Sequence, residues 1–161
     1  MIDKEKGYFA KEYLDLALQL QLEGKIEDAI ETYKKSIEFF PTTEAYTYLG
    51  WAYSLLDNFE DAIAHCKTAI EIDPNFGNPY NDIGSYLIQM GREQEAIAWL
   101  EKAITARKYS TKHFPYYNLG KVFELAGEWK KAMQHYDDAL TIKPDFVAAK
   151  NALFRVTALL N

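Results

Sequence analysis

Residues 46–53 read YTYLGWAY, and the spacing within this stretch recurs along the chain. Gly50 follows a tyrosine by four residues, precedes a large apolar residue by three, and is followed by Ala62 twelve residues later. The same frame surrounds two further glycines, Gly84, which lies 34 residues after Gly50, and Gly120, which lies 36 residues after Gly84. Self-similarity at a period of roughly 20–50 residues is typical of repeat proteins, so the chain is predicted to be a repeat array.

Helical segments are predicted in pairs around this frame. Apolar residues recur at helical spacing in each segment, and glycines and prolines fall at the joins between segments. The two helices of a pair are joined by only a few residues, so they must pack antiparallel. The predicted helices lie at about 8–22, 26–40, 43–56, 59–72, 78–90, 93–106, 114–126, 129–142 and 145–160. The predicted fold class is therefore all-α, with about nine helices and no strand.

Composition places the chain among soluble proteins of one domain. It has 161 residues, of which 48% are hydrophobic and 26% charged, a normal balance for such a domain. The 24 acidic and 18 basic side chains give a net charge of -6, which argues against nucleic acid or an anionic membrane as the main partner. Residues 1–104 carry 19 acidic and 9 basic side chains, whereas residues 105–161 carry 5 and 9, and a partner could be steered by that polarity.

Nothing in the sequence points to an oxidising compartment or to a membrane. Cys66 is the only cysteine, so no intramolecular disulfide can form. The N-terminal stretch MIDKEKGYFAKEY lacks the apolar core of a signal peptide, and no run approaches the roughly 18 apolar residues of a membrane span. We therefore expect a cytoplasmic protein, although a leader removed from the sequence would leave no trace here.

No group of side chains suggests catalysis, a metal or a cofactor. His65, His113 and His135 are not grouped with one another or with carboxylates at a metal-ligand spacing. Cys66 falls where the repeat frame holds a bulky apolar residue, so it is expected to be a buried, inert thiol. There is no glycine-rich phosphate loop and no Gly-x-Ser-x-Gly motif. We predict that the protein is not an enzyme and holds no cofactor or metal.

The repeat frame resembles that of the tetratricopeptide repeat family, whose signature is an aromatic residue, Leu-Gly and Tyr, then Ala, an aromatic residue, Ala and Pro. Two stretches carry it almost completely: Tyr46, Leu49, Gly50, Tyr53, Ala62, Ala69 and Pro74, and then Tyr116, Leu119, Gly120, Phe123, Ala132, Tyr136, Ala139 and Pro144. The first copy has Ala17 in place of the glycine, and the third copy lacks the closing proline. The four copies cover almost the entire chain.

This resemblance implies a right-handed α-α superhelix, a solenoid of antiparallel helix pairs. Repeat units are expected at about 10–42, 43–76, 77–112 and 113–146 of a single domain, with a capping helix at about 145–160. The glycines are expected where two helices cross, because a larger side chain would hold the backbones apart. The aromatic residues of the signature are expected to pack in the core: Tyr13, Tyr33, Tyr46, Tyr53, Tyr80, Tyr116, Phe123 and Tyr136.

In the family that the chain resembles, the first helices of successive repeats line a concave groove. The residues predicted to bind a partner there are Tyr48, Trp51, Asn78, Asn81, Asp82, Phe114, Tyr117, Asn118 and Lys121, with Arg155 of the last helix extending the row. Large aromatic anchors with polar neighbours are typical of binding hot spots, and asparagine amides suit the backbone of an extended peptide. The alternative is that these aromatics stack on each other or on the next helix.

Two functions remain open at this point. The first is a non-enzymatic interaction module or scaffold that binds a peptide or protein partner in the groove. The second is a small cytoplasmic chaperone that holds one dedicated partner, since small acidic proteins of this length resemble the secretion chaperones. The regularity of the four repeats favours the first hypothesis.

A carboxylate clamp for the C-terminal tails of chaperones is a known use of the family. It needs Lys and Asn on one first helix and Lys and Arg two units later. The corresponding residues here are Leu14, Leu18, Tyr48, Asn78 and Asp82 in units one to three, or Thr47, Trp51, Asp82, Phe114 and Asn118 in units two to four. Neither set matches, so binding of chaperone tails by that mechanism is not expected.

Two irregular stretches carry separate predictions. The segment ARKYSTKH at 106–113 holds two extra residues and is either a longer turn or a contact loop for an acidic partner. The last helix has apolar residues on more than one face, whereas a terminal cap is normally polar outside: Leu153, Phe154, Val156, Leu159 and Leu160. We expect part of this helix to pack on another chain, which would make the protein a homo-oligomer.

Overall fold

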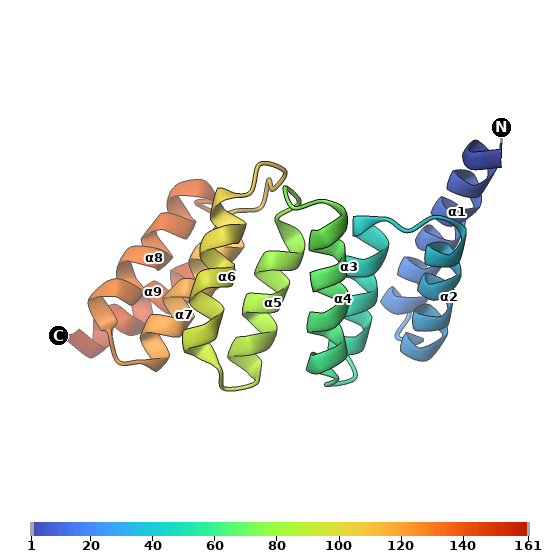
Figure 1. Ribbon diagram of the computed structural model, residues 1–161. Helices are drawn as coiled ribbons and strands as arrows, with labels where there is room; N and C mark the ends of the chain where they lie inside the picture. Colours follow the sequence, from blue (N-terminus) through green and yellow to red (C-terminus); the bar gives the residue numbers. More distant parts are fainter. Residues whose placement is uncertain (1, 161) are drawn as a thin grey trace.

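A computed structural model of the protein describes residues 2–160 and consists there of nine α-helices with no β-strand. The helices are α1 (Ile2–Leu22), α2 (Ile26–Phe39), α3 (Thr43–Ser54), α4 (Phe59–Ile72), α5 (Asn78–Gln89), α6 (Glu93–Thr105), α7 (His113–Leu125), α8 (Trp129–Ile142) and α9 (Val147–Leu160). They stand side by side in chain order, with the N-terminus at one end of the row and the C-terminus at the other (Figure 1). The predicted all-α solenoid is confirmed.

Two helices begin two or more residues away from the position that the sequence predicts. Helix α1 begins at Ile2 and not near residue 8, because its first turns contain no proline and continue through Gly7 even though they lack an apolar face. Helix α9 begins at Val147 and not near residue 145. The backbone N–H of Phe146 donates to the carbonyl of Lys143 at 3.1 Å, which makes residues 143–146 a turn before the helix.

The glycines of the repeat frame lie where two helices cross. A Cβ atom placed on Gly50 would lie 2.9 Å from the backbone oxygen of Ala62 in α4, and one on Gly84 would lie 2.5 Å from Cδ2 of Leu100 in α6. A Cβ atom on Gly120 would overlap the ring of Tyr136 in α8. The expected role of these glycines is confirmed, since a side chain there would separate the paired helices.

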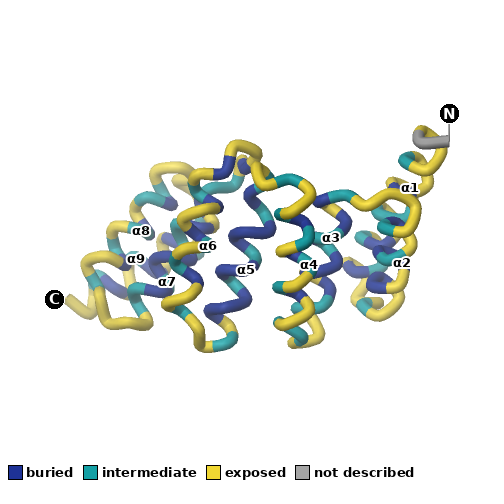
Figure 2. Tube along the Cα trace, viewed as in Figure 1, coloured by how far each residue is buried: buried dark blue, intermediate teal, exposed yellow. Residues whose placement is uncertain are grey.

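The core runs along the inner sides of the helices, and the turns at both edges of the row are mostly exposed (Figure 2). The signature alanines of the second helices, such as Ala62 and Ala132, are fully buried. The signature aromatics divide into two groups, because Tyr33, Tyr80 and Tyr136 are buried while the other five are half-buried: Tyr13, Tyr46, Tyr53, Tyr116 and Phe123. Several half-buried rings stack on a histidine instead of sitting inside the core.

Histidines occupy equivalent places on α4 and α8 and are held between aromatic rings. The ring of His65 stacks on those of Tyr46 and Tyr53, with centroid distances of 6.1 and 5.1 Å. The ring of His135 likewise lies 5.2 Å from that of Phe123. Burial lowers the pKa of both histidines, so each imidazole is held in its neutral form.

The segment between α6 and α7 packs on the preceding turn. The backbone N–H of Gly77 donates to the carbonyl of Lys108 at 3.1 Å, and the N–H of Lys108 donates to the carbonyl of Asn75 at 2.9 Å. The ammonium of Lys108 lies 2.6 Å from the carboxylate of Asp73, and the buried ring of Tyr109 lies against Gly77. This stretch therefore forms a longer, ordered turn, and Lys108 is paired within the chain rather than free for an acidic partner.

The last helix covers α8 with one face. Ala149, Ala152 and Val156 are buried, whereas Phe154 is 79% exposed and Leu159 and Leu160 are also exposed. The packing of this exposed apolar face on another chain stays a prediction.

None of the helices described here combines the length and the apolar character needed to cross a bilayer.

Candidate functional site

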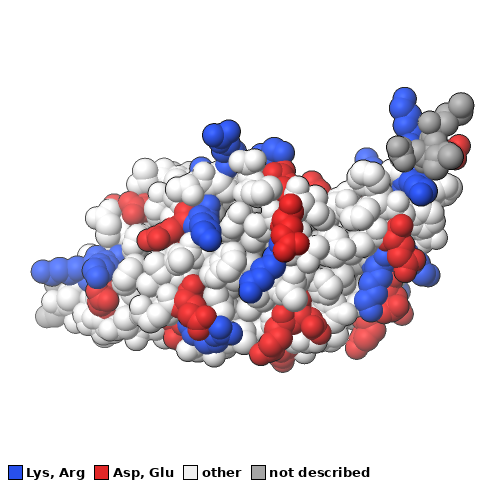
Figure 3. All heavy atoms as spheres, in the orientation of Figure 1, with Lys and Arg blue, Asp and Glu red and all other residues white. Residues whose placement is uncertain are grey.

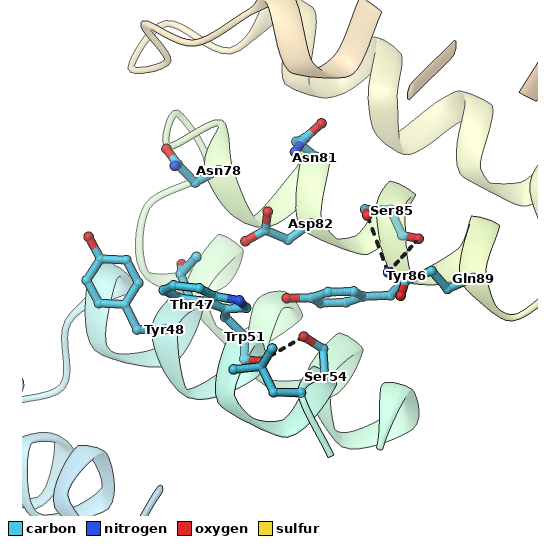
Figure 4. A pocket seen from close by; sticks show the side chains of 11 residues that line it. Thr47, Tyr48, Trp51, Ser54, Asn78, Asn81, Asp82, Ser85, Tyr86 and Gln89 are labelled. Carbon is cyan, nitrogen blue, oxygen red and sulfur yellow. Dashed lines mark hydrogen bonds between the residues drawn. The ribbon is translucent and has the colours of Figure 1, made fainter. Parts of the chain in front are cut away.

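An open cavity of about 430 Å³ lies between α3 and α5, the first helices of the second and third units (Figure 4). Its volume falls within the range of pockets that bind small ligands or side chains. The residues from the α3 side are Thr47, Tyr48, Trp51, Ser54 and Leu55, and those from α5 are Asn78, Asn81, Asp82, Ser85, Tyr86 and Gln89. The two helices thus contribute one wall each.

Helical spacing explains why these side chains share the cavity. Tyr48, Trp51 and Leu55 follow one another at intervals of three and four residues, so they lie on one face of α3. Asn78 and Asp82 are related in the same way on α5. Five of the nine residues predicted to bind a partner therefore meet in one place: Tyr48, Trp51, Asn78, Asn81 and Asp82.

Six lining residues are outside the predicted set, and three of them lie toward the C-terminal ends of the two helices. Tyr86 and Gln89 extend the Asp82 face of α5 by one and two helical turns, and Ser54 follows Trp51 by three residues. The sequence contained a usable signal, because each residue lies three to seven positions from a predicted one. These residues lie toward the C-terminal ends of α3 and α5. The predicted groove positions did not reach that far beyond the repeat glycines.

Asp82 carries the only formal charge among the residues that line the cavity. Its carboxylate points from α5 toward the α3 wall, on the side of Trp51 (Figure 4). Burial raises the pKa of Asp82 to about 7, against a smaller opposing effect of hydrogen bonding by Asn81. None of the ion pairs formed within residues 2–160 involves this carboxylate.

The two aromatic residues of α3 retain accessible surface in the cavity. Trp51 is 36% exposed and Tyr48 is half-buried. On the opposite wall Tyr86 is buried, and its phenol points toward Trp51 (Figure 4). Burial, followed by the neighbouring Asp82 charge, raises the pKa of Tyr86 well above its usual value, so the phenol stays protonated and can donate a hydrogen bond.

Asn81 and Asn118 bind each other. The side-chain nitrogen of Asn118 donates to the side-chain oxygen of Asn81 at 3.0 Å, and both residues are buried. The bond links α5 to α7, so the amide of Asn118 is engaged within the protein. Asn81 still lines the cavity with the rest of its side chain.

Phe114 and Tyr117 lie apart from the cavity and pack on the turn before α9. The ring of Phe114 meets that of Phe146 edge to face at 5.6 Å, and the ring of Tyr117 meets it at 5.2 Å. Lys121 places its ammonium 5.9 Å from the centre of the Tyr117 ring. Phe114 and Tyr117 thus make the stacking contacts of the alternative, but Phe114 stays 41% exposed, and partner binding by these residues of α7 stays a prediction.

Arg155, which was predicted to extend the row of groove residues, is paired within the protein. Its guanidinium makes two hydrogen bonds of 2.7 and 2.8 Å to the carboxylate of Glu124, which also accepts a hydrogen bond from the hydroxyl of Tyr136. The Arg155 contact holds the pKa of Glu124 below its usual value. Arg155 therefore ties α9 to α7.

The described part of the chain contains no group of three or more His, Cys, Asp or Glu side chains that could hold a metal ion. Cys66 is buried in α4, and burial raises the pKa of its thiol well above the usual value. A thiol held protonated in this way is a poor nucleophile.

Charged groups on the outer surface are interspersed. On the face shown in Figure 3, acidic and basic side chains alternate over the helices, and no large patch of either sign forms. Several of these pairs are short ion pairs within one helix turn, such as Lys34 with Glu31 and Arg92 with Glu95. Exposed pairs of this kind add little to stability.

Comparison with known proteins matches most of the chain to one family. Two family models, both described as tetratricopeptide repeat, match residues 43–76 and residues 76–145. The TPR repeat-containing protein YpiA of Bacillus subtilis strain 168 is 26% identical over 143 residues, which make up 88% of this chain and 33% of that protein. The Small glutamine-rich tetratricopeptide repeat-containing protein 2 of Mycosarcoma maydis is 38% identical over 77 residues, 47% of this chain and 22% of that protein. The matched parts are thus a third or less of these relatives.

Solved structures share the same architecture. Pseudomonas aeruginosa pilF superimposes with a TM-score of 0.89 at 18% identity, over 96% of this chain and 70% of that chain. A MamA structure gives a TM-score of 0.75 at 28% identity, over 93% of this chain and 81% of that chain. The first TPR of Spaghetti (RPAP3), bound to the HSP90 peptide SRMEEVD, gives 0.68 at 16% identity, over 74% and 93%.

Proposed function

Because the chain belongs to the tetratricopeptide repeat family, we propose that it is a non-catalytic interaction module that binds a segment of a partner protein in the cavity between α3 and α5. The observation that carries this proposal is the exposure of Trp51 beside a polar, open cavity. A tryptophan that keeps 36% of its surface exposed at the edge of a cavity offers an anchor to another protein, and tryptophan is among the residues enriched in binding hot spots.

The other lining groups suit a polypeptide ligand. The carboxamides of Asn78 and Gln89 each offer donors and an acceptor, and Tyr48 adds a half-buried aromatic surface. Backbone amides of an extended segment need such partners when they leave water. Aromatic contact area and amide hydrogen bonds then act together, as in other peptide-binding grooves.

The partner we propose is different from an acidic chaperone tail. The HSP90 peptide SRMEEVD is a ligand of the Spaghetti repeat domain, and it ends in acidic residues. The cavity between α3 and α5 holds Asp82 and no basic side chain among its lining residues. The carboxylate of Asp82 would repel a second carboxylate, so an acidic ligand is disfavoured there.

Site-specific photocrosslinking tests the proposal. A benzophenone amino acid is placed at Trp51 or Gln89 in the cavity, and at Ala64 or Ala98, which are exposed on α4 and α6. Crosslinks to one partner from both cavity positions but from neither control position support the proposal. With the purified partner, Trp51→Ala should then weaken binding about tenfold or more. A partner captured only from the α4 and α6 positions would contradict it.

A further inference from the structure

We infer that the cavity between α3 and α5 binds the guanidinium group of an arginine side chain that a partner protein presents. The inference rests on the proposed function, because it names the chemistry of the ligand at the same site. It follows from three features of the cavity: an unpaired carboxylate, aromatic surface beside that carboxylate, and the lack of any basic lining residue.

The first feature is the carboxylate of Asp82. It lies half-buried in the wall of the cavity, and none of the ion pairs within residues 2–160 includes it. A carboxylate that is removed from water without a cation is costly, and the raised pKa of Asp82 has the same cause. A ligand cation would supply the missing charge, so the site favours a positive group.

The second feature is the aromatic surface next to Asp82. Trp51 and Tyr48 lie on the α3 wall toward which the Asp82 carboxylate points (Figure 4). Cations are attracted to the faces of aromatic rings, most strongly to tryptophan. A guanidinium is planar, so it can lie on a ring while its N–H groups donate to a carboxylate and to neutral acceptors. The side-chain oxygens of Asn78 and Gln89 provide such acceptors.

The third feature is the lack of a basic side chain among the residues that line the cavity. The part of the chain that contains the cavity, residues 1–104, also has a net negative charge, with 19 acidic and 9 basic side chains. A net charge of this sign favours the approach of a basic segment. A metal ion is a less suitable occupant, since Asp82 belongs to no group of three or more His, Cys, Asp or Glu side chains in the described residues.

Titration with single amino acid derivatives tests this inference without knowledge of the partner. The probe is N-acetyl-L-arginine amide, and the readout is the indole N–H resonance of Trp51, assigned with a Trp51→Phe variant. At pH 8, where Asp82 is ionised, we expect a saturable shift with a dissociation constant of about 1–10 mM. N-acetyl-L-citrulline amide, which has the same shape but no charge, should bind at least about fivefold more weakly.

Two variants of the protein complete the test. Asp82→Asn should weaken binding of the arginine probe by about fivefold or more, while Asp137→Asn, which removes an exposed carboxylate on α8, should change it by less than about twofold. Circular dichroism melting confirms that both variants are folded. N-acetyl-L-lysine amide should bind at least about threefold more weakly than the arginine probe.

Three results would overturn the inference: equal binding of the citrulline probe, unchanged binding by Asp82→Asn, or binding of the lysine probe as tight as that of arginine. If one of these results is found but crosslinks from residue 51 still identify a partner, the arginine inference fails and the proposed function stands. If the arginine probe binds as expected but crosslinks arise only outside the cavity, the proposed function fails instead.

Discussion

The side-chain amide of Asn118 on α7 donates a hydrogen bond of 3.0 Å to the side-chain oxygen of Asn81 on α5, and both residues are buried. This bond joins the first helices of two consecutive repeats beside the cavity. The position of the Asn81 side chain, which lines the cavity, therefore depends on a contact with the neighbouring repeat.

We expect Asn118→Ala to lower the free energy of unfolding by about 1–2 kcal/mol, because the substitution leaves the Asn81 oxygen buried without its donor. Urea titration measures the change. The matched control is Asn78→Ala on the same helix as Asn81, which is less buried and should cost less than about 0.5 kcal/mol. Equal, small effects of both substitutions would show that the side chains of Asn118 and Asn81 are not hydrogen-bonded in solution.

Gly50 and Gly7 should respond in opposite ways to alanine. Gly50→Ala is expected to cost about 1–3 kcal/mol, since the new methyl group meets the Ala62 backbone at 2.9 Å and one helix must move. Gly7→Ala lies within α1 and has open space, so the better helix propensity of alanine should raise stability by about 0.5–1 kcal/mol. Thermal and urea unfolding distinguish the two, and a neutral Gly50→Ala would contradict the tight crossing.

Asp82 should make the protein less stable as the pH rises. Its folded-state pKa of about 7 lies above the unfolded value of about 3.9, so its contribution to stability is full below the lower value and is lost as pH rises through the higher one. Asp82→Asn is therefore expected to be more stable than wild type at pH 8 by about 1–2 kcal/mol. This is less than the free energy that the whole pKa difference would give, because the side chain is partly accessible to water. The gain should disappear at pH 4. A constant difference across this range would show that Asp82 titrates normally.

The stacked histidines should act in the opposite direction. Burial lowers the pKa of His65 and His135 below the unfolded value of about 6.5. Stability that depends on their neutral form is present above that value and is lost as pH falls through the folded pKa of each histidine. In a His65→Gln, His135→Gln variant, the loss of melting temperature between pH 8 and pH 5 should be smaller than in wild type. His113, whose pKa burial also lowers, is left unchanged in both proteins, so its contribution cancels in the comparison.

Local spacing predicted much of the candidate site. The position of Trp51 next to Gly50, and of Asp82 two residues before Gly84, placed both on the groove face of their helices. That inference rests on the helical spacing and on the family resemblance, which implies that the first helices line a groove. The same reasoning grouped Phe114 and Tyr117 with them, but it could not detect Phe146, which lies in a turn outside the frame and binds both rings.

Contacts between distant segments were beyond the reach of the pattern. Lys108 is 35 residues from Asp73, and Arg155 is 31 residues from Glu124, yet each pair is in contact. A charged residue in a sequence has many possible partners, and the solenoid stacking decides which one lies within reach.

The sequence by itself determined the repeat, its helices and which side chains share one face of each first helix, because these depend on spacings of three, four and about 34 residues along one chain. Only the tertiary structure decided which side chains of that face remain accessible. Neighbouring repeats fill the space beside α7 with Phe146 and pair Asn118 with Asn81, but leave Trp51 and Asp82 facing an open cavity. Whether a side chain binds within the protein or stays accessible depends on distances between helices that no periodicity encodes.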